Sequence, residues 1–571
     1  MRPLACSMSV FLGLAFCLPS AAQEVPQTLP GQTPQDIDPA GRTPAVEPAR
    51  IDPATLAVVA ACPFAGKGEL TLARIDVAGA TLVPRAEIDT AVADLVGHPA
   101  DAAVLCTARD RVAAVYAAHG EALAAVDIPE QALAGGVLTL RVTEGRIRNV
   151  VIENAEALGP SAALVRAYLG ALETGQATRW SDVERAFLLV REIPGADVRF
   201  ALRRTSDGTA DGLEIVAIAQ PRRKFDIGVS VQNLGSHEVG PASASLRVDA
   251  NGFSRFGERS SLVLLSSLGG EQKVVQLIEE MHLGASGLVL LGDIAYGRSQ
   301  PGGALAALEL DGHSLVSRLG VRYPLVRTRA VSLDTGVRIE AINQTNDLGF
   351  LRSTGLGMIP LFDENLRVVA LEANARWQPP GSGLAASAGL ELRKGLGIAG
   401  ASEAGDPLLS RAQAHPDFMS AKLNLGARWS AHPGATSTPF LSFNGAVQLS
   451  DSPLPAYEEF QVGNYTIGRG FDPGAASGDS AVAGQLEAGV DLRGSAGAAS
   501  VFAFADAAHL WNRDAGATRA SLRSFGLGLR SYTRAGQFTL TWAVPQTGTV
   551  PGGAKADARV MFTFNHTFSI R

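Results

Sequence analysis

The sequence predicts a transmembrane β-barrel of about sixteen antiparallel strands, preceded by two small α+β domains. Three observations predict this fold class. Charged residues make up only 18% of the chain, yet no window approaches the roughly 18 uninterrupted apolar residues that a spanning helix needs. From about residue 224 to the end, short segments alternate apolar and polar residues, as barrel strands do. Before them, one order of strands and helices occurs twice.

Composition also excludes some classes of function. Hydrophobic residues reach 46%, with 62 glycines, which fits a sheet whose two faces meet different solvents better than an ordinary enzyme. The net charge of −7 gives no support to nucleic-acid binding, which needs a basic surface. No Walker-type loop, His-x-x-x-His pair with a Glu, or cysteine cluster is present in the sequence. We therefore expect no enzyme, no cofactor and no metal site.

Residues 1–22 read as an export signal. Arg2 supplies a positive start, Val10 to Leu18 form a short apolar core, and Ser20-Ala21-Ala22 offers a cleavage site. The apolar run is too short for a membrane anchor. We expect the mature chain to begin at about Gln23. Residues 23–60 are rich in Pro, Gln, Asp and Ala, and predict an extended or disordered linker.

Two cysteines, Cys62 and Cys106, remain after the signal, because Cys6 and Cys17 leave with it. An even pair in an oxidising compartment favours a disulfide. Two cysteines with no nearby histidine pair provide too few ligands for zinc. The sequence therefore predicts a structural Cys62–Cys106 bond.

Residues 61–145 predict the first α+β domain. Its elements are a strand at Leu70–Val77, a helix that opens at Pro84, a second helix that stops at Gly120, and strands at Ala124–Ile128 and Val137–Val142.

Residues 146–221 repeat this β-α-α-β-β order. The predicted strand is Ile147–Ile152, the helices are Ala162–Leu169 and Asp182–Arg191, and the final strands are Ala196–Arg203 and Leu213–Ala219. A repeat of about 75 residues does not arise from chance alternation. Both units should expose strand edges suited to strand addition by an extended peptide.

Residues 224–571 predict the barrel. In Gln537–Trp542, Phe, Leu and Trp share one face while Gln and Thr share the other. A soluble sandwich also alternates, but here the polar face stays polar over segments of about ten residues. The sixteen segments start near Phe225, Pro241, Arg259, Gln272, Ser286, Glu309, Thr328, Leu366, Gly383, Asp417, Pro439, Ala483, Ser500, Ala520, Gly536 and Ala558.

The connections between these segments give an independent check. Long connections alternate with short ones, as in an outer-membrane barrel that the chain enters from the periplasm. An even number of strands lets the two ends pair and leaves no backbone edge in lipid. The long connections are Thr345–Asn365, Gly395–Pro416, Ser450–Val482 and Val544–Asp557.

Three motifs lie at defined places in this topology. The longest informative loop contains Ile467-Gly468-Arg469-Gly470-Phe471-Asp472, the thirteenth segment contains Phe502-Ala503-Phe504-Ala505-Asp506, and the first hairpin contains Gln232-Asn233-Leu234-Gly235-Ser236. One tripeptide is a weak signal, whereas the ordered set is specific. Together with the signal and the two repeated domains, it resembles the two-partner secretion transporters (TpsB). This is the haemolysin secretion/activation family of the ShlB, FhaC and HecB type, within the POTRA-bearing barrel superfamily.

The resemblance implies roles for the loop motif. Arg469 would lie at the tip of a loop folded into the barrel lumen and would pair with Asp506 on the wall, where a guanidinium can bind a carboxylate with two hydrogen bonds. Gly468 and Gly470 would let the backbone turn around the pair, and Phe471 would pack the tip in place. The wall part of the motif is Phe502, Phe504 and Asp506. Without the family, an exposed loop arginine is the simpler interpretation.

Two features depart from the family pattern. Many members carry an N-terminal plug helix in the lumen, and Gln23 to Arg50 shows no convincing helical period, so a plug is not expected here. Family barrels also tend to end in an aromatic residue, whereas this chain ends Phe568-Ser569-Ile570-Arg571.

The resemblance implies an outer-membrane translocator that secretes a partner exoprotein of the haemolysin or adhesin type. The partner would dock on the POTRA-like domains, and the barrel would contact outer-membrane lipid. Two alternatives stay open: a factor that inserts other outer-membrane proteins, whose members usually carry more POTRA domains, and a passive porin, whose members lack them.

Overall fold

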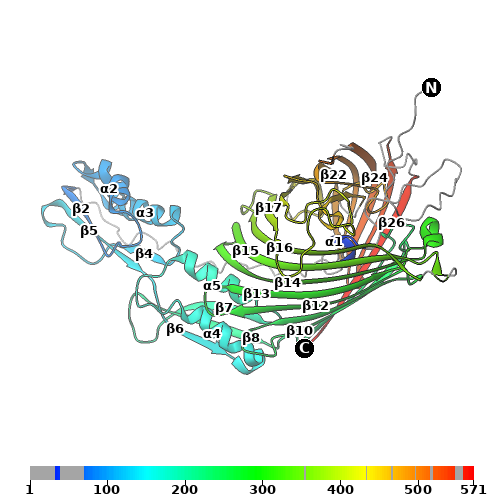
Figure 1. Ribbon diagram of the computed structural model, residues 1–571. Helices are drawn as coiled ribbons and strands as arrows, with labels where there is room; N and C mark the ends of the chain where they lie inside the picture. Colours follow the sequence, from blue (N-terminus) through cyan, green and yellow to red (C-terminus); the bar gives the residue numbers. More distant parts are fainter. Residues whose placement is uncertain are drawn as a thin grey trace.

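The computed structural model describes residues 32–38, 70–352, 355, 357–431, 434–463, 467–495, 497–514, 519–546 and 557–571. A large barrel carries two small α+β modules as an arm at one end, which we call the module end (Figure 1). None of the helices in these ranges has the length and apolarity of a membrane-crossing helix.

The first module packs two helices on a three-stranded sheet. Its sheet has the order β2-β5-β4, with β2 and β5 parallel, because the two helices separate these strands in sequence. Apolar faces of sheet and helices form one core around Ile88, Tyr116 and Leu138. The elements are β1 Leu70–Thr71, β2 Arg74–Ala78, α2 Arg85–Val92, η2 Ala93–Leu95, β3 Pro99–Ala100, α3 Ala102–Ala118, β4 Ala124–Asp127, η3 Ala134–Gly136 and β5 Val137–Glu144.

The second module repeats this arrangement, with the sheet order β6-β8-β7. Its core centres on Val165, Val183 and Ile215. The elements are β6 Arg146–Glu153, η4 Ala155–Ser161, α4 Ala162–Gly170, α5 Trp180–Glu192, β7 Asp197–Arg204 and β8 Gly212–Gln220.

Sixteen described strands close the barrel, each antiparallel to its neighbours, and β26 pairs with β9. The strands are β9 Phe225–Gln232, β10 Ser243–Asn251, β11 Arg259–Ser267, β12 Gln272–Leu283, β13 Leu288–Ser299, β14 Leu310–Arg327, β15 Val331–Leu348, β16 Ile359–Trp377, β17 Leu384–Gly395, β18 Met419–Ser430, β19 Ser437–Ser450, β22 Ser480–Gly494, β23 Gly497–Trp511, β24 Arg519–Thr533, β25 Gly536–Pro545 and β26 Arg559–Ile570. The predicted fold class is confirmed.

The outer face of the barrel is apolar. Strands alternate, so that on β24 Phe525, Leu527 and Leu529 are exposed outward while the residues between them are buried. Trp377 and Trp429 face outward near the module end, where aromatic residues border the lipid in membrane barrels. The alternating pattern in the sequence therefore records which residues face lipid.

Predicted strand starts differ from the observed ones most at β16. The sequence predicts a start near Leu366, but the strand begins at Ile359. Residues 359–365 contain Pro360 and acidic residues, which suit a loop, yet here they extend the barrel wall away from the module end with Phe362 and Glu364 turned inward and buried. The expected long loop at Thr345–Asn365 is correspondingly shorter.

The second module contacts the barrel directly. Arg329, in the turn after β14, pairs with Glu184 of α5 at 2.7 Å. The Tyr168 hydroxyl lies 3.2 Å from Nδ1 of His282 on β12, and both side chains are buried. This end of the barrel is therefore fixed to the second module by polar contacts.

The expectation of no helix between Gln23 and Arg50 is wrong. A short helix, α1 (Pro34–Ile37), lies inside the barrel (Figure 1). Thr33 caps it, since its Oγ1 accepts from the Asp36 N–H at 3.2 Å, and Pro34 occupies the first turn. A single turn is too short to produce a helical period, although Thr-Pro-x-Asp is a helix-start signal that could have revealed it.

Candidate functional site

The connection between β19 and β22 lies inside the barrel against inward-facing wall residues, and we call residues 451–479 the lumen loop. It contains η7 (Ala456–Glu458) and a short hairpin of β20 (Phe460–Val462) and β21 (Ala476–Gly478). Its apolar side packs on small inward residues of β22 to β24. The loop is therefore folded back against the inner wall.

Arg469, near the tip of this loop, binds Asp506 of β23. Its Nη2 donates to Asp506 Oδ1 at 2.7 Å and its Nε to Oδ2 at 3.1 Å. The backbone N–H groups of Gly468 and Arg469 also donate to Oδ2, at 3.2 and 2.9 Å. Arg469 and Asp506 are each 4% exposed. The carboxylate thus holds both the side chain and the backbone of the loop tip.

Two wall residues that the sequence interpretation missed complete this contact. Arg469 Nη1 donates to Glu487 of β22 at 2.7 Å, and Arg530 of β24 binds the same carboxylate with two bonds of 2.8 Å. Two guanidinium groups therefore meet two carboxylates, Asp506 and Glu487. Glu487 and Arg530 lie on separate strands far from the motif in sequence, so no local pattern marks them.

Phe502 and Phe504 face inward beside Asp506. The Arg469 guanidinium carbon lies 3.4 Å from the ring centroid of Phe504, and that of Arg530 lies 4.0 Å from Phe502. Each ring therefore supports one arginine through a cation–π contact. The Phe502 ring lies against Gly528 of β24, where an added Cβ would be 2.1 Å from the ring.

The other motif residues shape the loop tip. Gly468 adopts φ +82°, which favours glycine, and an added Cβ would lie 2.5 Å from Val462. Gly470 lies against Ser524 and Pro545 of the wall. Phe471 is 2% exposed within the apolar cluster. All four predicted loop residues therefore lie at the contact with the wall.

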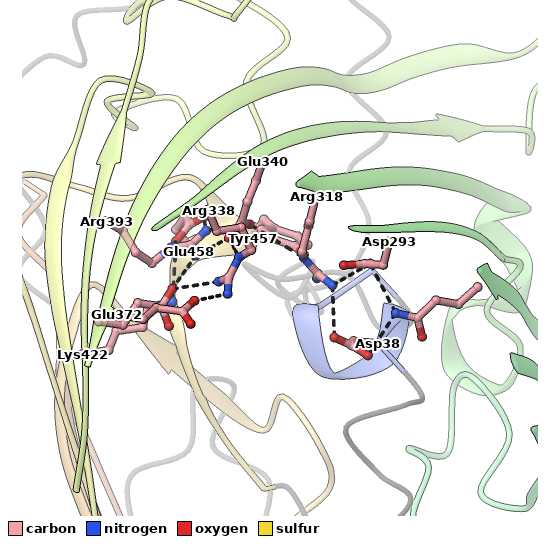
Figure 2. Close-up of polar contacts among 12 residues, drawn as sticks. Asp38, Asp293, Arg318, Arg338, Glu340, Glu372, Arg393, Lys422, Tyr457 and Glu458 are labelled. Atoms are coloured by element: carbon pink, nitrogen blue, oxygen red, sulfur yellow. Dashed lines mark hydrogen bonds and ion pairs between the residues drawn. The ribbon is translucent and has the colours of Figure 1, made fainter. Parts of the chain in front are cut away.

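The base of the lumen loop is held by a second set of charges (Figure 2). The Glu458 carboxylate accepts hydrogen bonds from Arg393 Nε at 2.8 Å and from Arg393 Nη2 at 2.6 Å. Arg393, on β17, also donates to Glu340 of β15 at 2.8 and 3.1 Å and to Glu391 at 2.6 Å. The Arg393 side chain is 5% exposed and that of Glu458 1%. This ion pair was not predicted.

The helix α1 reaches the same part of the wall. Asp38 lies 3.1 Å from Nη1 of Arg318 on β14, as Figure 2 shows. Gln344 and Asn346 of β15 bind Gln32 at 2.8 and 3.2 Å. The segment from Gln32 to Asp38 is thus attached to lumen-facing side chains of several strands.

Two sequence predictions remain, the disulfide bond and the lack of a metal site. Cys106 is buried on α3 and is disulfide-bonded, while Cys62 lies outside the described residues, so the pairing stays a prediction. Within the described ranges, no group of three or more His, Cys, Asp or Glu side chains is arranged to hold a metal ion.

A closed sixteen-strand barrel, two POTRA-like modules at one end and a lumen loop define the class of outer-membrane POTRA barrels. Family models agree. Residues 70–145 match the ShlB-type POTRA domain, and residues 213–531, more than half of the chain, match the haemolysin secretion/activation protein ShlB/FhaC/HecB. The chain belongs to this family of two-partner secretion transporters. It is an outer-membrane barrel whose POTRA domains lie in the periplasm.

Individual relatives are more distant. The outer membrane transporter CdiB of Escherichia coli O6:K15:H31 (strain 536 / UPEC) is 28% identical over 171 residues, which span 30% of this chain and only 28% of the relative. The structure of CdiB from Escherichia coli has a TM-score of 0.73 at 17% identity, covering 91% of this chain and 94% of that one. The structure of CdiB from Acinetobacter baumannii has a TM-score of 0.65 at 14% identity, covering 91% of this chain and 95% of that one. At these identities the structures show a shared fold.

Proposed function

We propose that this chain carries an unfolded partner protein, of the haemolysin or adhesin type, from the periplasm to the cell exterior through its barrel. The observation that supports this proposal best is the lumen loop. It is a segment of chain rather than part of the wall, and it is held by ion pairs at its tip and base. Such contacts can break and re-form without disturbing the hydrogen bonds of the barrel strands.

The partner would dock before it enters the barrel. In each module one edge strand already has a backbone carbonyl bound by arginine: Val77 of β2 by Arg85, and Val150 of β6 by Arg166 at 2.6 Å. The opposite edges are β4, with four residues, and β7, with eight. We assign docking to β7 because its length allows an extended peptide to add as a strand.

Transport would proceed without a cofactor in this scheme. The partner arrives unfolded, the lumen loop moves aside, and folding of the partner outside the cell prevents its return. The alternative of a membrane-protein insertion factor shares the barrel and modules. The match of residues 213–531 to the haemolysin secretion/activation protein favours secretion.

The test is to replace Arg469 and measure secretion. R469A leaves the side chain of Asp506 buried without its main partner, which typically costs about 3–5 kcal/mol for a buried ion pair, so the loop loses its fixed position. We expect secretion of the partner to fall at least tenfold while the barrel still assembles. R469K should fall nearly as far, because a lysine cannot bind two carboxylates and stack on Phe504 together.

The matched control is R519A, at an exposed arginine at the start of β24, which should secrete at the wild-type level. Heat-dependent migration on gels measures assembly of each variant. Normal secretion by an assembled R469A barrel would show that the loop tip plays no part in transport.

A further inference from the structure

Two segments inside the barrel, the one that carries α1 and the base of the lumen loop, contact the same wall arginine. Arg318 Nη1 lies 3.1 Å from Asp38 and 3.1 Å from Asp293 of β13. Its Nη2 donates to the Tyr457 hydroxyl at 3.3 Å. Tyr457 is fully buried in the loop base, directly before Glu458. One guanidinium thus joins the N-terminal segment to the loop (Figure 2).

We propose that Arg318 and Arg393 are positioning residues that couple these two segments, so that release of either one loosens the other. The inference rests on the proposed function, since it assumes that the lumen is cleared for transport. It assigns to the loop base an anchor separate from the Arg469 contact at the tip.

The charges of the wall explain why this anchor can open reversibly. The charged wall residues in this network are four acids and four bases: Asp293, Glu340, Glu372 and Glu391 with Arg318, Arg338, Arg393 and Lys422. The wall network is therefore balanced by itself. The two segments add the carboxylates of Asp38 and Glu458.

When the segments leave, both arginines keep partners on the wall. Arg393 retains Glu340 and Glu391, and Arg318 retains Asp293. No wall charge is then left buried and unpaired, which is the state that makes breaking an ion pair costly.

The loop tip behaves differently. The wall at the loop tip contributes two carboxylates, Asp506 and Glu487, but only one arginine, Arg530, which binds Glu487. Departure of Arg469 therefore leaves Asp506 without an arginine partner. The tip therefore resists opening, whereas the base and α1 form a reversible unit.

Coupling requires that loosening of the loop base also weakens the contacts of α1 with the wall. Glu458 binds Arg393 and approaches Lys422, and in neither contact does it touch α1. The hydrogen-bonded route from Glu458 to α1 runs through its neighbour Tyr457 to Arg318 and then to Asp38. A weaker route runs along the wall through Arg393 and Glu340, whose carboxylate lies 3.9 Å from Arg318 Nε. A hydrogen bond to a charged group is strong enough to give a population change of about tenfold.

The experiment measures thiol labelling of α1 in the full-length protein in outer-membrane vesicles, with no partner present. Pro34→Cys reports release of α1, and the unsubstituted chain gives the background. We expect E458Q to raise the labelling rate of this cysteine about tenfold. D491N removes a carboxylate that binds Arg428 at 2.6 Å, outside this network and away from both segments, and should leave the rate unchanged.

Y457F supplies the decisive variant, because it removes the hydroxyl that Arg318 binds and keeps the ring. In the Y457F background, E458Q should raise labelling much less, because only the weaker route through Glu340 remains. The proposal is overturned if E458Q labels at the parental rate, if D491N raises labelling equally, or if the E458Q effect persists undiminished with Y457F.

A reciprocal measurement covers the case in which E458Q does not assemble. Coupling between sites is symmetric, so D38N should raise labelling of Ala456→Cys in the loop base by a similar factor. An unchanged rate would overturn the proposal. Because neither measurement needs a partner, a chain that secretes nothing can still show coupling, and the two ideas fail separately.

Discussion

The buried carboxylates of this chain are held by several donors each, and Glu144 of the first module shows the effect outside the membrane. Its carboxylate accepts from the N–H groups of Thr81 and Leu82 at 2.7 and 2.8 Å, from the Thr81 hydroxyl, and from Tyr116 at 2.7 Å. Burial alone would raise the pKa of Glu144. The hydrogen bonds outweigh burial and hold this pKa below its ordinary value of 4.5.

This pKa predicts acid sensitivity of the first module. A carboxyl whose pKa is lower in the folded state stabilises the fold above its unfolded pKa, and loses that contribution as pH falls through the folded pKa. The wild-type module should therefore exceed E144Q in unfolding free energy at neutral pH, and the difference should shrink below about pH 4.5. Urea unfolding of the two-module fragment, followed by circular dichroism, measures this; a difference independent of pH would contradict the account.

The contacts of Arg469 require an arginine at this position and not a lysine. Its side chain donates to two carboxylates from three nitrogens, and its guanidinium carbon lies 3.4 Å from the centroid of the Phe504 ring. Asp506 and the Phe-x-Phe strand could be assigned from the sequence because a family motif places them together. Glu487 and Arg530 could not, since only strand pairing across the barrel brings them to the loop.

At the scale of elements, β23 and β24 pack closely because a large side chain on one strand lies against a glycine on the other. Phe502 faces the position of Gly528, and any side chain there would meet the ring. The wall beneath the loop tip is therefore built from an aromatic residue on one strand and a glycine on the next.

We predict that G528A lowers barrel stability. The added methyl would displace the Phe502 ring, and forcing extra atoms into packed regions costs about 1–3 kcal/mol. The measurement is the urea midpoint of the folded barrel on gels. G494A is the control, because a Cβ there meets nothing within 4 Å. Equal midpoints for G528A and the wild type would refute this packing argument.

The edge strand β7 carries the docking prediction. Its Arg199 is exposed. Placing a negative charge there should weaken binding of an extended segment that runs along this edge. We expect R199E in the full-length protein to retain at least about threefold less of the partner's N-terminal region in a pull-down, given the modest energy of exposed charges.

The control for docking is R148E on β6, the edge that Arg166 already covers. It removes only an exposed pair with Asp211, which contributes little. If R148E weakens binding as much as R199E, the assignment of β7 is wrong.

Much of the element structure could be predicted from the sequence. Alternation gave the strand number because lipid on one side and a polar lumen on the other force a period of two. The boundary of β16 was wrong because Pro360 and the acids after it suit both a loop and a wall that extends beyond the membrane. The helix α1 was missed because four residues are stabilised by wall contacts rather than by a periodic face.

At the scale of the whole molecule, the modules, the barrel and the lumen segments form one connected path. Arg329 and His282 tie the second module to the barrel end where a partner would enter. Inside, α1 and the lumen loop are held by inward-facing charges. The order of these parts along the path is what the proposed function requires: docking, entry, and release of the segments in the lumen.

The most direct test of the central claim is to locate the partner during transport. A partner that carries a tightly folded domain at its C-terminal end should stop inside the barrel. Thr567 and Phe568 are neighbours on β26, but Thr567 faces the lumen and Phe568 faces lipid. A cysteine in the stopped partner should crosslink to T567C and not to F568C. Crosslinking to both positions equally, or to neither while the unblocked partner is still secreted, would contradict passage through the lumen.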